Sequence, residues 1–303
     1  MQINKVLIEN TFAEAFTMRA TRMTITAADE YWAMQAAQAA TGFATSVIGC
    51  GVEAGIEGPS PDTPDGRPGV DCLFFAISKD GLEAALTERI GQAVMTAPTT
   101  ACFCGPLVES VGAPTENANI GGKLRFFGDG YQASKIVGDT RYWRIPVMDG
   151  EFLIQEEFAV TKAVGGGNFL ILAENEAAAL GAVRAAIEKM RELRGIILPF
   201  PGGAVRSGSK VGSQYKFLTA STNTAYCPTI KGRVEDSKLP GGVNAVVEIV
   251  IDGLTGDLVG KAMQVGIKAA AEVPGVVGIT AGNYEGRLGK HQFHLHKLLG
   301  GDV

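Results

Sequence analysis

The sequence of 303 residues has no surplus of positive charge. Lys and Arg number 27 against 32 Asp and Glu, so the formal net charge is −5 at pH 7. Proteins that bind nucleic acid usually carry a basic surplus or a basic stripe on one face. Because the chain is acidic and no aromatic run is interleaved with basic residues, the sequence predicts no nucleic-acid partner.

Long hydrophobic runs are also missing. No uncharged apolar stretch reaches the roughly 18 residues that a transmembrane helix needs, and the first segment, MQINKVLIENTF, lacks the apolar centre of a signal peptide. We therefore expect no membrane partner and a cytoplasmic location. Hydrophobic residues nevertheless make up 46% of the chain, which is enough for a compact fold with a large core.

Metal-ligating side chains are scarce. An odd number of cysteines, spread along a long chain without a CxxC pair, predicts neither a disulfide framework nor a zinc site. The three histidines gather in KHQFHLHKL, where we expect a terminal strand with His294 and His296 on one face. Since no carboxylate or thiol accompanies them, the sequence predicts no metal site. The cysteines are Cys50, Cys72, Cys102, Cys104 and Cys227.

Strand-like and helix-like periodicities alternate in a fixed order in the first third of the chain. Segments with period 2 read as strands, and segments with apolar residues at helical spacing, opened by polar caps and closed by Gly, read as helices. The predicted elements are a strand at 16–27, a helix at 29–42, strands at 43–50 and 70–78, a helix at 80–94 and a strand at 100–105. This βαββαβ order is typical of a split βαβ, or ferredoxin-like, unit.

The same order of elements returns in the second half with different residues. Its strands are predicted at 168–174, 195–200, 243–252 and 275–283, and its helices at 175–195 and 255–273. Between the two units, the turn signals GDG and GD separate alternating segments and indicate β-hairpins. We therefore predict an α+β fold with a ferredoxin-like lobe at 1–121, a β-rich insert at 122–164 and a second ferredoxin-like lobe at 165–303.

One carboxylate interrupts the apolar strand predicted at 243–252. Every residue from Ala245 to Ile251 is apolar and largely β-branched except Glu248. A bare carboxylate inside a sheet is unfavourable unless it is paired or protonated. The strand alone leaves two explanations open, a structural Glu satisfied by Lys, Arg or backbone donors, and a catalytic Glu.

Glycine-rich loops supply the other candidates, since the chain has 40 glycines. The segment LPFPGGAVRSGSKVGSQYKF brings glycines, Ser207, Ser209, Arg206 and Lys210 into the break between two strands, which suits an anionic or carbonyl-bearing ligand. It lacks the order of a P-loop, and a flexible crossover loop explains it equally well.

Three shorter segments add weaker candidates. Glu53 lies in the loop predicted after the strand at 43–50, Arg67 lies in the dense turn DTPDGRPG, and Thr99 and Thr100 precede a strand. Each feature alone is more often a loop, a cap or a turn than a binding site.

Taken together, these stretches closely resemble the formylmethanofuran:tetrahydromethanopterin formyltransferases. The resemblance is carried by TGFATSVIGCGVEAGIE, DTPDGRPG, TAPTTACFCG, GGNFLIL, PFPGGAVRSGSK, YKF, VNAVVEIVIDGL and AGNYEGRLGKHQFHLHKL. It runs from ENTFAEAF near the start to the last predicted strand, so it covers essentially the whole chain.

The resemblance implies reversible transfer of a formyl group between the amine of methanofuran and N5 of tetrahydromethanopterin, with these carriers as substrates and no bound cofactor or metal. It also implies two ferredoxin-like lobes and a homotetramer with active sites at subunit contacts. Glu248 matches a strand glutamate that is catalytic in the family. The residues that we expect to bind substrate are Glu53, Arg67, Thr99, Thr100, Arg206, Ser207, Ser209 and Lys210.

A second function stays open at this point. The chain is also compatible with a non-catalytic subunit that scaffolds a complex of formyltransferase and formyl-hydrolase subunits.

Overall fold

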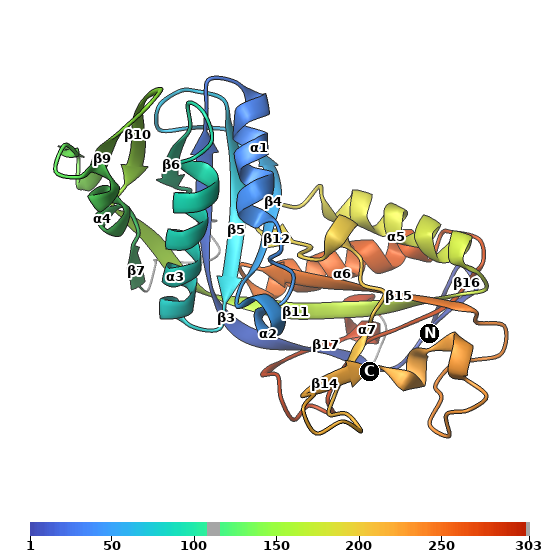
Figure 1. Cartoon of the computed structure of the whole chain (residues 1–303). Helices are drawn as coiled ribbons and strands as arrows, with labels where there is room; N and C mark the ends of the chain where they lie inside the picture. The colour runs from blue at the N-terminus through green and yellow to red at the C-terminus, as the bar shows by residue number, and fades with distance from the viewer. Residues whose placement is uncertain (108–115, 301–303) are drawn as a thin grey trace.

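Figure 1 shows the computed structural model of the chain, in which residues 1–107 and 116–300 are described. The fold is mixed α/β and is built on one large mixed sheet of 15 strands. Two long strands, β3 (Phe12–Thr26) and β11 (Glu157–Ala173), lie side by side in it and are antiparallel from the pair Ala20–Thr161 to the pair Phe16–Gly165. Each strand continues past this shared stretch, so both take part in the two halves of the molecule.

The second part of β3 organises the N-terminal half. It pairs with β5 (Gly69–Ala76) and β6 (Ala101–Cys104), and β5 pairs with β4 (Glu53–Pro59). The strand order is β4-β5-β3-β6, antiparallel throughout. Helices α1 (Glu30–Thr41) and α3 (Lys79–Arg89) cover one face, and a π-helical turn at Ile90–Val94 continues α3 (Figure 1). Their apolar sides enter a core with Phe74 and Ile25.

The predicted strand at 43–50 is wrong. Residues Val47–Cys50 form a short helix, α2, and the strand begins later, at Glu53. The Ser46 side chain caps the helix by accepting a hydrogen bond from Ile48 N, and Gly51, with a φ of 75°, ends it. The Glu53 carboxylate accepts a further hydrogen bond from Val47 N, so polar contacts outweigh the β propensity of the apolar residues.

The C-terminal half repeats this arrangement around the second part of β11. Strand β11 pairs with β15 (Ala245–Gly253) and β16 (Val276–Thr280), and β15 pairs with β12 (Ile196–Ile197). The strand order is β12-β15-β11-β16, again antiparallel. Helices α5 (Glu176–Met190) and α6 (Gly256–Ala270) start at the side-chain caps Asn175 and Thr255 and cover one face of these strands (Figure 1).

The hairpins predicted between the two halves are confirmed. Strands β8 (Ala133–Val137), β9 (Thr140–Val147) and β10 (Gly150–Gln155) form a meander, and β10 joins the large sheet by parallel pairing with β6. The chain before them is helical, with α4 at Gly121–Leu124 and a 3-10 turn at Arg125–Gly128, and β7 (Glu116–Asn119) pairs with the start of β11.

Strands near both ends of the described chain belong to the C-terminal half. Strand β2 (Val6–Ile8) pairs with β16, and β17 (His291–His294) pairs with the start of β3. The prediction that His294 and His296 share a strand face is wrong, because buried Leu295 starts the helix α7 (Leu295–Leu298) and the His296 ring lies 2.9 Å from Ile8 O. The remaining elements are β1 (Gln2–Ile3), the pair β13 (Ser209–Val211) and β14 (Ala220–Thr222), and 3-10 turns at Pro201–Gly203, Thr224–Tyr226 and Pro228–Ile230.

The helices α5 and α6 have 15 residues each. Among residues 1–107 and 116–300, no helix combines the length and the apolar character that a bilayer span requires.

Candidate functional site

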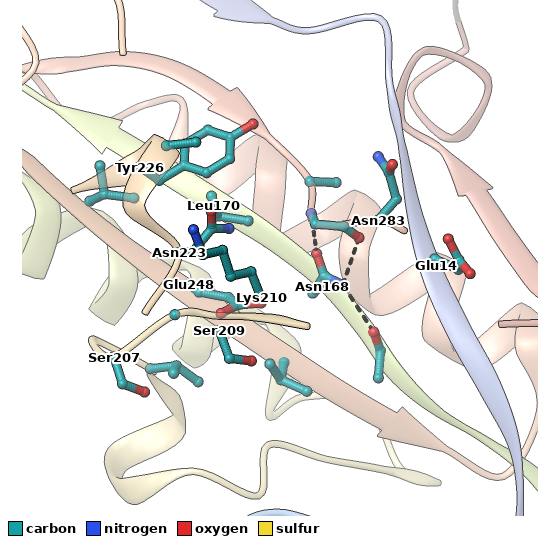
Figure 2. Close-up of a pocket in the computed structure, with 18 of the residues that line it drawn as sticks. Glu14, Asn168, Leu170, Ser207, Ser209, Lys210, Asn223, Tyr226, Glu248 and Asn283 are labelled. Atoms are coloured by element: carbon teal, nitrogen blue, oxygen red, sulfur yellow. Dashed lines mark hydrogen bonds between the residues drawn. The ribbon is translucent and has the colours of Figure 1, made fainter. Parts of the chain in front are cut away.

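A pocket of about 400 Å³ lies on the face of the C-terminal strands that α5 and α6 leave uncovered (Figure 2). The alternation of β15 explains its floor, since Ile249 and Ile251 enter the core under the helices whereas Val250 and Glu248 point the other way, into the pocket. Strand β11 supplies Leu170, which is paired with Glu248 across the sheet. Loops from four parts of the chain form the walls, at 205–210, 223–227, 236–238 and 281–284.

Glu248 lies in the pocket, and its charge has no partner among residues 1–107 and 116–300. Its backbone is fixed by two hydrogen bonds to Val205, Val205 N to Glu248 O at 2.8 Å and Glu248 N to Val205 O at 2.9 Å. In the described part of the chain, no hydrogen bond or ion pair reaches its carboxylate. Burial raises the pKa of Glu248 from 4.5 to about 7. The structural explanation, a Glu satisfied by a cation or by backbone donors, is therefore not supported.

The bridge between Val205 and Glu248 brings the glycine-rich loop over the pocket. Figure 2 shows Glu248 beside Ser209 and Lys210 of this loop. Lys210 Nζ donates a hydrogen bond to Thr224 Oγ1 at 2.8 Å, and Ser207 also faces the pocket. The loop residues that were predicted to bind substrate and that line the pocket with Glu248 are Arg206, Ser207, Ser209 and Lys210.

Asn168 holds the opposite wall. Its Nδ2 donates to Gly166 O and to Gly282 O, and its Oδ1 accepts from Gly282 N at 2.6 Å (Figure 2). Asn283, the residue after Gly282, donates a hydrogen bond from Nδ2 to Thr11 Oγ1 at 3.2 Å. Neither asparagine was predicted from the sequence, although Asn168 directly follows the glycines in GGGNFLIL, where a polar residue at the start of an apolar strand was a usable signal.

Glu14, on β3, was also missed. Its carboxylate accepts hydrogen bonds from four backbone N–H groups of the segment 284–289, and its side chain is buried. Burial alone would raise the pKa of Glu14, but the four donors lower it below its ordinary value. The available signal was the lone charge in FAEAFT, which interrupts a strand as Glu248 does.

Glu53 reaches the pocket from the N-terminal half and lies against a second buried acid. Its Oε1 accepts from Val47 N at 3.0 Å, and Asp252 Oδ1 accepts from Gly166 N at 2.9 Å. Burial and the neighbouring charge of Glu53 raise the pKa of Asp252, and burial raises the pKa of Glu53. Asp252 Oδ2 has no donor within the described residues, which is consistent with a proton shared between the two carboxyl groups.

The other three predicted binding residues lie away from the pocket. Arg67 donates to Thr26 Oγ1 at the far end of β3 and to Thr99 O at 2.6 Å. Thr100 is buried and donates to Val94 O. The structure therefore brings Arg67, Thr99 and Thr100 together with each other but not with Glu248.

No three His, Cys, Asp or Glu side chains of residues 1–107 and 116–300 come together as metal ligands would. Cys227 lines the pocket, whereas Cys72 and Cys102 are buried in the sheet, where burial raises the pKa of each thiol.

Both parts of the chain are similar to known proteins. Residues 1–147 match the family described as formylmethanofuran-tetrahydromethanopterin formyltransferase, and residues 150–298 match the family described as FTR, proximal lobe. The formylmethanofuran–tetrahydromethanopterin formyltransferase of Methylococcus capsulatus is 56% identical over 304 residues, which cover 99% of this chain and 100% of the relative.

Two solved structures superpose on the chain, each with 48% identity. The formylmethanofuran:tetrahydromethanopterin formyltransferase from Methanosarcina barkeri has a TM-score of 0.91, with 98% of this chain and 100% of that chain covered. A chain in the formyltransferase/hydrolase complex from Methylorubrum extorquens, solved with methylofuran, has a TM-score of 0.94, with 100% and 99% covered. Sequence and backbone agree over the full length, and the chain belongs to the formylmethanofuran:tetrahydromethanopterin formyltransferase family.

Proposed function

We propose that this protein transfers a formyl group reversibly between formylmethanofuran and N5 of tetrahydromethanopterin, by direct transfer in the pocket that contains Glu248. The family membership supports the reaction. The observation that carries the assignment to this pocket is Glu248 itself, an unpaired carboxylate whose pKa of about 7 suits proton transfer near neutral pH.

The chemistry requires one proton to move between two nitrogens. N5 attacks the formyl carbon, which gives a tetrahedral intermediate with a negatively charged oxygen, and collapse breaks the bond to the methanofuran nitrogen. N5 loses its proton and the departing amine gains one, so the transfer balances without a bound cofactor or a metal. We assign Glu248 the relay, as the carboxylate that takes the proton from N5 and delivers it to the amine.

The glycine-rich loop supplies charge and donors near this relay. Lys210 and Arg206 are exposed cations at the pocket, and Ser207 and Ser209 add hydroxyl donors. Both carriers are acidic, so local cations favour their binding despite the negative net charge of the chain. We propose that these side chains bind substrate and that Lys210 also stabilises the developing oxyanion.

The other four residues predicted to bind substrate are not assigned a substrate contact in this proposal. The Glu53 carboxylate is occupied by Val47 N and Asp252, so we assign it to the wall of the pocket and keep its contact with substrate as a prediction. The contacts of Arg67, Thr99 and Thr100 with substrate also stay predictions, and the assignment of Glu248 does not depend on them.

We further propose that the two halves are ferredoxin-like lobes. The antiparallel orders β4-β5-β3-β6 and β12-β15-β11-β16, each with two helices on one face, support this description. Boundaries at 121/122 and 164/165, the homotetramer and a cytoplasmic location stay predictions. The formyltransferase/hydrolase complex from Methylorubrum extorquens supports formyl-hydrolase subunits as a further class of partner for this chain.

A transfer assay with the purified chain and both carriers tests the enzyme against the scaffold alternative. We expect formyl transfer by the isolated protein, measured as the formation of N5-formyl-tetrahydromethanopterin. Activity that is absent until hydrolase subunits are added would support the scaffold alternative, and the Glu248→Gln variant serves as the matched inactive control.

A further inference from the structure

Glu14 is a buried carboxylate whose hydrogen-bond donors, among the described residues, are all backbone N–H groups. Oε2 accepts from Tyr284 N at 2.7 Å and Gly286 N at 2.8 Å, and Oε1 accepts from Leu288 N at 2.6 Å and Gly289 N at 2.5 Å. The residue is 1% exposed, and no cation of the described residues forms an ion pair with it. The segment 284–289 is thus wrapped around one carboxylate, as backbone N–H groups surround an anion in a nest.

The wrapped conformation depends on the glycines of this segment. Gly286 has a φ of 73°, which glycine adopts at little cost. A Cβ at Gly289 would lie 2.4 Å from Ala15 O and 2.8 Å from Glu14 Cγ, so only glycine brings this N–H so close to the carboxylate. Without the carboxylate, four N–H donors would face one another around an unfilled space.

The first residue of segment 284–289, Tyr284, is also part of the pocket. Tyr284 lines the pocket together with Glu248, and its ring lies 6.3 Å from the Phe16 ring, measured between centroids. Burial and the nearby charges of Glu248 and Glu14 raise the pKa of Tyr284, so its phenol keeps its proton at neutral pH and is a hydrogen-bond donor. Glu14 and Glu248 lie on different strands. Tyr284 links them, because its backbone N–H donates to Glu14 and its side chain lines the pocket with Glu248.

We propose that Glu14 is a positioning residue that holds segment 284–289 so that Tyr284 donates a hydrogen bond to the formyl oxygen during transfer. The proposal rests on the proposed function for the reaction that Tyr284 assists. Glu14 itself touches no substrate. It acts through the backbone of Tyr284 and of the residues that follow, 270 or more positions away in sequence.

A double-mutant cycle of Glu14→Gln and Tyr284→Phe tests the link. Gln keeps the length of the side chain but turns one of the two oxygens into a donor that faces two N–H groups. We expect each single variant to lower kcat about 10-fold or more with KM changed a few fold, because a lost oxyanion donor acts mainly on the transition state. The double variant should be no slower than the slower single variant, because Glu14 acts through Tyr284.

Glu83→Gln is the matched control. Glu83 also accepts a backbone hydrogen bond, from Asn119 N at 3.2 Å, and its pKa is also lowered, although burial opposes this, because Lys123 and Asn119 N donate to it. It lies outside the pocket, so kcat should stay within about two-fold of wild type. Wild-type kcat in Tyr284→Phe, or effects of the two changes that multiply in the double variant, would overturn the proposal.

Two readouts do not need activity and separate this proposal from the proposed function. In Glu14→Gln, amide hydrogen exchange should become faster at residues 284–289, and the contact between the Tyr284 and Phe16 rings, followed by NMR, should weaken. An unchanged contact between these rings in a folded Glu14→Gln protein would show that Glu14 does not position Tyr284, whatever the chain catalyses. Failure of the wild-type transfer assay alone would count against the proposed function.

Discussion

Replacement of Glu248 by Gln tests whether catalysis depends on proton transfer by this side chain or only on its shape. Gln fills the same volume between Val246 and Val250 and keeps hydrogen-bonding atoms, but it cannot carry a proton from N5 to the departing amine. We expect kcat to fall by roughly 10²-fold or more with KM changed only a few fold, which is typical of the loss of a general acid–base. In the wild type, kcat/KM should rise with pH through about 7, because the carboxylate is the form that accepts the proton.

The same substitution should change stability in a pH-dependent way. Raising the pKa of Glu248 from 4.5 to about 7 makes its ionised form at most about 3 kcal/mol less favourable in the folded than in the unfolded protein. The sign follows from linkage, since a carboxyl with a raised folded-state pKa binds its proton more tightly when folded. The wild type therefore loses stability as pH rises from 4.5 to 7, and the loss is complete above 7.

Urea unfolding at pH 4.5 and pH 8 measures this difference. Relative to wild type, Glu248→Gln should gain up to about 3 kcal/mol of unfolding free energy between the two pH values while losing most of its activity. Val250→Ala, on the same face of β15, is the control, because its stability change should be independent of pH. If folded Glu248→Gln keeps wild-type kcat from pH 5 to 9, the relay is wrong and the residue is structural.

Three further predictions concern the surroundings of the relay. Cys227→Ala should leave kcat within a few fold, because direct transfer needs no nucleophile, and a formylated Cys227 trapped by mass spectrometry would refute this. Lys210→Met should raise KM for the acidic carriers by roughly 10-fold at low salt and less at high salt, and should also lower kcat because an oxyanion donor is lost; wild-type KM and kcat at both salt concentrations would contradict its role. Glu53→Gln should make the unfolding free energy fall less steeply above pH 5 than in wild type, because an amide needs no proton to donate to Asp252. Urea unfolding across pH 5 to 9 measures this, and identical slopes would exclude the shared proton.

The sequence predicted those parts of the fold that depend on neighbouring residues. Period-2 and helical patterns located the strands and helices of both halves, because each pattern reports which side of one element is buried. The prediction of a strand at 43–50 was wrong because it used this apolar pattern alone. The apolar residues of this segment are typical of a strand, but Ser46, inside the segment, and the side chain of Glu53, just after it, stabilise a short helix instead.

In the candidate site, too, the sequence indicated the features that neighbouring residues reveal. Two residues that line the pocket were candidates from the sequence, Glu248 because it breaks an otherwise apolar strand and Lys210 because cations and serines gather in one glycine-rich loop. Glu14 was missed because its donors lie at 284–289, at the other end of the chain, and nothing local indicates a nest. The length of β3 and β11, which lets them join both halves, was also not indicated, since the pattern of each strand reports faces and not partners.

The pKa values of the two strand carboxylates of the pocket, Glu14 and Glu248, are shifted in opposite directions. Glu14 receives four N–H donors, which lower its pKa and keep it ionised, so it is suited to hold backbone and unsuited to exchange protons. Glu248 receives no side-chain or backbone donor among the described residues, and burial raises its pKa to about 7, where a proton is held and released with little driving force. The difference lies in the number of donors that the surrounding loops direct at each carboxylate. Carboxylates whose pKa values are pushed apart in this way suit different tasks, which supports the proposed assignment of Glu14 as a positioning residue and of Glu248 as the acid–base.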